Sequence, residues 1–102
     1  MKISKLEDTP TTEGHGGTVM REVITAKDGA PNFAMRIIEV EPGSSTPSHS
    51  HNWEHEVFIL SGRGIVKGEK GDKEIAKDSV VFIPPNEHHC LVSTGDEPLR
   101  FV

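Results

Sequence analysis

The stretch HSHNWEHEVFIL, residues 49–60, places three histidines and two glutamates directly before an apolar run. On extended backbone, side chains two positions apart point to the same face. One face would therefore carry the three histidines and two of the apolar residues that follow: His49, His51, His55, Val57 and Ile59. Imidazoles turned inward need partners, because burying an unpaired polar group costs free energy. Convergent histidines therefore favour a metal site over a histidine-rich surface loop without a ligand.

The composition narrows the class of protein. The chain has 102 residues, enough for one modest core, and its 11 basic and 16 acidic residues give a net charge of −5. No basic cluster exists to attract nucleic acid or an anionic membrane, so we expect neither as a partner. No stretch approaches the roughly 18 apolar residues of a membrane span, and the first residues lack a secretion signal. With its one cysteine, Cys90, the chain is expected to be cytoplasmic.

Short runs rich in β-branched and apolar residues alternate with turn residues along the chain. We expect eight strands, at residues 18–25, 33–40, 56–60, 63–69, 73–76, 80–83, 88–93 and 99–102. No stretch sustains a helical period for three turns, so the sequence predicts an all-β sandwich or barrel. Residues 1–15 are expected to form an N-terminal arm, and residues 16–102 a single barrel domain.

Residues 51–55, HNWEH, also match the H-x-x-E-H pattern of inverted zincin peptidases, which requires a helix. Pro47 before the pattern, the β-branched run after it and the glycines at 62 and 64 all argue against a helix here. The helical interpretation is therefore disfavoured.

A second group of residues lies about 30 positions further on. Residues 78–89 read as a turn, a strand, a Pro-Pro-Asn turn and a pair of histidines. Together the two groups resemble the two motifs of the cupin superfamily. The first is Gly43, five residues, His49-x-His51, three residues, His55, six residues and Gly62. The second is Asp78, five residues, Pro84-x-Asn86, two residues and His89.

The sequence departs from the family pattern at four positions. His55 stands where cupins usually have glutamate, Asp78 and Asn86 stand where the pattern has glycine, and Ser93 stands where it ends in asparagine. Asp and Asn tolerate the turn conformations that glycine serves. The chain looks most like small single-domain cupins with a four-histidine site, and residues 28–33 and 41–43 also resemble that subgroup.

The resemblance implies a double-stranded β-helix, the jelly-roll cupin barrel, and four metal ligands: His49, His51, His55 and His89. Glu56 is the rival for the third position, but its parity places it on the opposite face unless a bulge intervenes. His88 and His89 differ in parity, and the motif spacing selects His89. Cys90 is expected to be a small buried hydrophobe.

A cation held by four neutral imidazoles keeps its full charge and should attract an anionic ligand. Manganese or iron is favoured by the resemblance, and zinc, nickel and copper are also compatible with imidazole. The resemblance suggests a metal-dependent dioxygenase-like oxidoreductase or an isomerase acting on a small oxygen-rich or anionic molecule. A non-catalytic sensor or storage module that binds metal and metabolite is the alternative, and a metal that merely stabilises a small core is a third. Pocket candidates are Arg36, Trp53, Val57, Ile59, Phe82 and Leu91.

The strand at 56–60 is apolar on both faces, since Val57 and Ile59 alternate with Phe58 and Leu60. If the first pair faces the barrel interior, the second pair lies outside and needs a cover. We therefore predict a homodimer.

Overall fold

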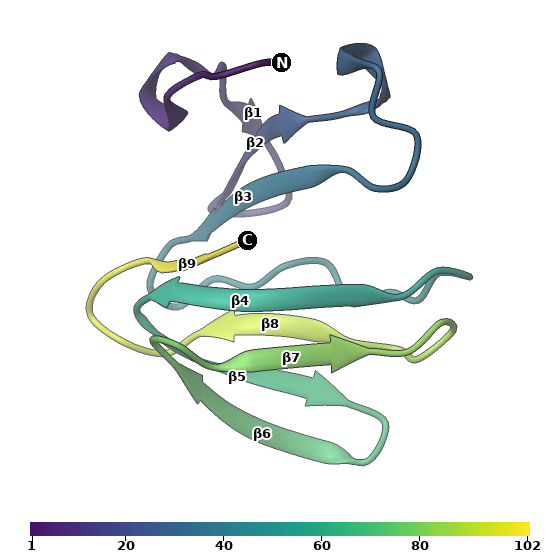
Figure 1. Cartoon of the computed structure of the whole chain (residues 1–102). Coiled ribbons are helices and arrows are strands. Elements are labelled where there is room, and N and C mark those ends of the chain that lie inside the picture. Colours follow the sequence, from purple (N-terminus) through teal and green to yellow (C-terminus); the bar gives the residue numbers. More distant parts are fainter.

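The computed structural model describes all residues, 1–102, and its regular structure is almost entirely β (Figure 1). Nine strands follow one another along the chain: β1 (Thr12–Glu13), β2 (Thr18–Ile24), β3 (Met35–Val40), β4 (His55–Ser61), β5 (Arg63–Gly68), β6 (Gly71–Ala76), β7 (Val80–Ile83), β8 (Cys90–Ser93) and β9 (Leu99–Phe101). Two short 3-10 turns, η1 (Leu6–Asp8) and η2 (Ala26–Asp28), are the only helical segments. No helix has the length and apolar character needed to cross a membrane.

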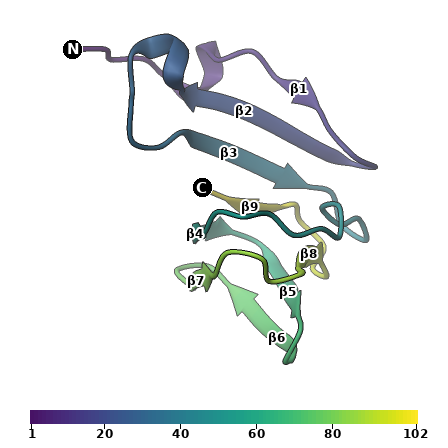
Figure 2. The ribbon, with the colours of Figure 1, turned by 90° about the vertical axis from the view of Figure 1, so that its right-hand side faces the viewer.

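The strands form two antiparallel sheets that face each other. One has six strands in the order β1-β2-β3-β9-β4-β7, and the other has three in the order β6-β5-β8. Figure 2 shows the smaller sheet lying below and beside β4, β9 and β7, with the β2–β3 ribbon extending away from it. The all-β, jelly-roll prediction is confirmed, and each of the eight expected strands is present within a few residues of its predicted bounds.

The ninth strand, β1, was not expected. Thr12 pairs with Met20 and Glu13 pairs with Val19, so two residues of the predicted arm join the sheet edge. Near the start of the chain, the Lys2 ammonium lies 2.8 Å from the Asp28 carboxylate and also donates to the carbonyl of Val23 at 3.1 Å. The division into an arm, 1–15, and a barrel, 16–102, remains a prediction.

The hydrophobic core lies between the two sheets. It consists of nine buried side chains: Val40, Val57, Ile59, Val66, Ile75, Ile83, Leu91, Leu99 and Phe101. In β4 the alternation is as expected, because Val57 and Ile59 are buried whereas Phe58 is 40% exposed. His55 therefore begins a strand whose inward face continues into the core.

Several turns contain residues of the two motifs that resemble those of cupins. Asp78 and Asn86 have φ angles of 71° and 69°, in the left-handed region that glycine usually occupies. Gly62, with φ of 86°, lets the chain pass from β4 into β5 against the backbone of Pro98 and Leu99. These turns place the second histidine group beside the first.

Candidate metal centre

Backbone pairing brings the two histidine groups together. The N–H of His49 donates to the carbonyl of His89 at 3.1 Å, and the N–H of His89 donates to the carbonyl of His49 at 2.9 Å. The residue Asn86, in the Pro-Pro-Asn turn, donates its N–H to the carbonyl of His51. His49 and His51 thus lie outside any strand, on extended backbone held by the turn before β8.

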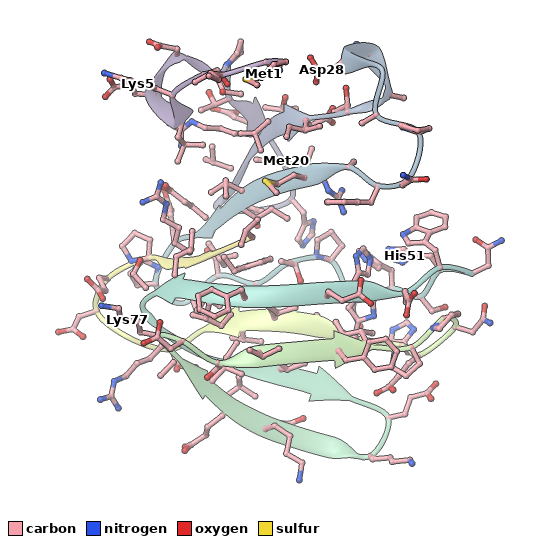
Figure 3. All side chains as sticks on the ribbon, in the orientation of Figure 1. Met1, Lys5, Met20, Asp28, His51 and Lys77 are labelled. Carbon is pink, nitrogen blue, oxygen red and sulfur yellow. The ribbon has the colours of Figure 1, made fainter.

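Four imidazole rings gather at this point. The ring of His51 lies 4.3 Å from that of His49, 4.7 Å from His55 and 5.4 Å from His89, measured between centroids. The ring of His89 lies 5.1 Å from His49 and 5.6 Å from His55. Figure 3 shows His51 at the end of the barrel where β4 begins.

Three of the four histidines have ligand atoms close enough together to share one cation. Ligand atoms of His49, His51 and His89 lie within 4.8 Å of one another. The Nε2 atoms of His51 and His55 are 3.3 Å apart. Two nitrogens bound about 2.1 Å from one metal lie roughly 3.0 to 3.4 Å apart at octahedral or tetrahedral angles. His49, His51 and His89 therefore form a group that could hold one metal ion, whereas His55 lies outside that group and approaches it through His51.

Two ring nitrogens of the cluster differ in their hydrogen bonding. The Nδ1–H of His89 donates to the carbonyl of Glu87 at 2.9 Å, which leaves Nε2 with a free lone pair. The Nδ1 atom of His51 is buried without a hydrogen-bond partner. Buried polar atoms without a partner are uncommon in folded proteins, and the side chains of Arg21, Ser93 and Arg100 each have one as well.

Burial and neighbouring positive charge favour the neutral form of two of the site imidazoles, His49 and His55. Desolvation is the largest cause that lowers the pKa of His55, to about 4, and His51, Arg36, His89 and His49 add to it. Desolvation also lowers the pKa of His49. A neutral imidazole is the form that binds a metal, so no proton has to be displaced from these two near neutral pH.

The burial of the neighbouring residues agrees with the parity argument for Glu56 and with the motif spacing for His89. His89 is only 6% exposed, whereas His88 is exposed and its ring lies 2.8 Å from the Ser48 hydroxyl. Glu56 is exposed, and desolvation and the nearby Glu54 carboxylate raise its pKa. Cys90 is buried, as expected of a small hydrophobe.

The sequence pattern of the cupin domain family matches residues 36–102, which include all four clustered histidines. This chain belongs to the cupin domain family. An oxalate-binding protein of Thermotoga maritima is 29% identical over 109 residues, a match that covers 100% of this cupin and 90% of that protein. The structure of the polyketide cyclase RemF of Streptomyces resistomycificus superposes with a TM-score of 0.91 at 32% identity, covering 99% of this chain and 75% of the cyclase.

Other relatives are much longer. A mannose-1-phosphate guanylyltransferase of Salmonella typhimurium is 31% identical over 77 residues, which are 74% of this cupin and only 16% of that enzyme. The likeness there is confined to one part of the longer protein.

The pocket candidates of this cupin lie in different places. Val57, Ile59 and Leu91 are buried in the core. Trp53 is 57% exposed, and its ring lies 4.6 Å from that of His51, at the outer side of the cluster. Phe82 is exposed on β7. Arg36 is half-buried, with Nη1 3.9 Å from the sulfur of Met20, and its charge helps lower the pKa of His49 and His55.

A cavity of about 450 Å³ reaches His89 from the side of β6 and β7. Its wall includes core residues of this cupin, and also Lys73, Glu87 and Phe82. Lys73 and Glu87 were not predicted from the sequence, although the alternation in β6 places Lys73 on the same face as Ile75. This alternation is the feature of the sequence from which the position of Lys73 could have been predicted.

Proposed function

We propose that this cupin binds one divalent transition metal through His49, His51, His55 and His89. The observation that carries the proposal is the convergence of the imidazoles: ligand atoms of His49, His51 and His89 lie within 4.8 Å of one another, and the Nε2 atoms of His51 and His55 are 3.3 Å apart. Histidine at position 55, where cupins usually have glutamate, makes the donor set neutral. Manganese or iron is the metal that we favour.

The neutral donor set determines what else binds. Glu54 and Glu56, the carboxylates nearest to His55 in the sequence, are exposed. Arg36 adds a positive charge close enough to lower the pKa of His55. The site as a whole is therefore cationic, and we infer that it takes a small anionic molecule with oxygen donors.

When bound, the metal would supply Lewis acidity to an oxygen ligand. Arg36 would hold a carboxylate of that ligand, and Trp53 would shield the cluster from bulk water at the outer side. The oxalate-binding relative supports a small dicarboxylate, whereas the polyketide cyclase supports chemistry on an oxygen-rich molecule. We favour a metal-dependent oxidoreductase or isomerase, with non-catalytic binding of metal and metabolite as the second candidate.

We also propose that the protein is a homodimer. Phe58, Val80 and Phe82 are exposed on the outer face of the neighbouring strands β4 and β7, where Phe58 pairs with Val80. Such an apolar sheet face favours a protein contact. Light scattering of the wild type and of Phe82→Glu tests this: we expect a dimer and a shift toward monomer. A monomeric wild type at about micromolar concentration would contradict it.

Calorimetric titration with oxalate tests the ligand class. We expect heat of binding with the manganese-loaded chain, none with the metal-free chain, and binding weakened at least about tenfold by Arg36→Met, because a carboxylate loses a charged hydrogen-bond donor. Equal binding with and without metal would contradict the proposal. Oxygen consumption and product analysis with small hydroxy acids, diketones and phenolics then separate an enzyme from a binding module.

A further inference from the structure

The segment that carries His49 and His51, residues 48–51, lies outside the nine strands. Its backbone meets the β7–β8 turn, residues 84–89, where His49 and His89 exchange hydrogen bonds. The Asn86 N–H also donates to the carbonyl of His51. Figure 1 shows the chain directly before β4 and the β7–β8 turn at the same end of the barrel. The relative position of the metal-ligand candidates on the two segments therefore depends on a small number of hydrogen bonds.

One further hydrogen bond joins the same two segments, and it is the only one between them that two side chains form. The Ser48 Oγ and His88 Nε2 atoms are hydrogen-bonded at 2.8 Å. A serine hydroxyl both donates and accepts, so the bond forms with either tautomer of the ring. Ser48 and His88 directly precede the paired His49 and His89, and both of their side chains are exposed. The bond therefore closes the histidine pair from the solvent side, away from the clustered rings.

The two segments differ in how they are anchored. The β7–β8 turn leads directly into β8, whose first residue, Cys90, pairs with Lys67 of β5. The His88 N–H also donates to the Glu69 Oε1 atom, in the turn between β5 and β6, at 3.5 Å. The Ser48–His88 bond thus connects a segment without regular structure to a turn that is fixed on the smaller sheet.

We propose that Ser48 and His88 are positioning residues, which hold the two ligand-bearing segments together and govern how readily a bound metal is released. The role in metal release rests on the proposed function, whereas the closing of the histidine pair rests on the hydrogen bond itself. A metal bound by residues of both segments leaves when the segments separate, and their separation breaks the Ser48–His88 bond. An exposed hydrogen bond without this role would leave the rate of release unchanged.

Hydrogen exchange in the metal-free, full-length chain tests the closing of the pair. We expect Ser48→Ala and His88→Ala each to raise the exchange rates of the His49 and His89 amides about threefold, as for the loss of one exposed hydrogen bond from a local opening equilibrium. The double variant should match the single variants, because the same bond is lost in all three.

Two serine variants serve as controls. Ser50 is exposed and adjoins His49, as Ser48 does, but its hydroxyl forms no hydrogen bond with another residue. Ser50→Ala should therefore exchange as the wild type does. Ser48→Thr keeps the hydroxyl and should restore the wild-type rates.

Release of Co²⁺ to excess EDTA, followed by visible absorbance, tests the consequence for the metal. We expect release about threefold faster in Ser48→Ala, in His88→Ala and in the double variant, with one ion per chain still bound when Co²⁺ is in excess. Gly29→Ala strains a turn of positive φ where a Cβ meets nothing within 4 Å. It lowers the stability of the fold and should leave the release rate unchanged, which separates positioning from stability.

Wild-type amide exchange in Ser48→Ala and His88→Ala would overturn the closing of the pair. Faster exchange with unchanged Co²⁺ release would overturn the positioning role, and so would an effect of Ser50→Ala as large as that of Ser48→Ala. Single effects that multiply in the double variant would show that the two side chains act separately, against the proposal. A wild type that binds no Co²⁺ would contradict the proposed function, and amide exchange would still test the hydrogen bond.

Discussion

Replacing Ile59 by alanine tests the alternation in β4 that turns His55 toward the interior. Ile59 is 0% exposed and belongs to the core cluster, whereas its neighbour Phe58 is 40% exposed. Removing three buried carbon atoms loses about 2.4 kcal/mol of transfer free energy, and the cavity left behind raises the cost to about 4 kcal/mol. Phe58→Ala removes more atoms but only part of their surface is buried, so we expect a loss of about 1 kcal/mol.

Urea unfolding followed by circular dichroism gives both free energies of unfolding. The metal-free proteins are compared at one concentration at which they share an oligomeric state. Otherwise a dimer contact that buries Phe58 would add to the loss of stability measured for Phe58→Ala. If Ile59→Ala does not fold, Ile59→Val, with an expected loss of about 1 kcal/mol, replaces it. A larger loss for Phe58→Ala than for Ile59→Ala would refute the assignment of faces, and with it the inward direction of His55.

Two further predictions concern the turn after β4 and the titration of the site. Gly62→Ala should destabilise the fold by more than about 2 kcal/mol, because a Cβ there meets the Pro98 carbonyl oxygen and approaches Leu99 Cα to 2.8 Å, at a φ of 86°. Gly29→Ala, with the same φ and nothing within 4 Å, should cost about 1 kcal/mol, and equal losses would contradict the packing argument. In the metal-free protein, the free energy of unfolding should fall as the pH is lowered from about 6.5 to about 4. The pKa of His55 is about 6.5 in the unfolded chain and about 4 in the folded chain, so over this range protonation favours the unfolded chain. His55→Gln should make that decline shallower, and an unchanged slope in urea unfolding would contradict the lowered pKa.

Much of this architecture could be predicted from local sequence. Alternation of apolar residues and the turn residues between them located eight strands, parity separated His55 from Glu56, and the motif spacing selected His89 over His88. The motif spacing also anticipated that Asp78 and Asn86 stand at glycine-like turns, which their positive φ angles confirm. These features depend on residues close together in the chain, where periodicity carries the information.

The rest depends on how distant segments pair. Thr12 and Glu13 form only two ladder positions with β2, too few for a periodic signal. The cavity beside β6 and β7 exists because these two strands pair with different partners, and single-strand patterns do not specify partners. His49 and His51 were expected on extended backbone, but the turn before β8, rather than a continuous strand, holds them.

Metal content of the purified, untagged chain is the most direct test of the central claim, that the clustered histidines form one metal centre. Elemental analysis should give about one transition-metal ion per chain in the wild type. His51→Ala and His89→Ala should lose it, whereas the exposed His88→Ala and His15→Ala should keep it. Wild-type metal content in His51→Ala or His89→Ala, or its loss in His15→Ala, would contradict the account.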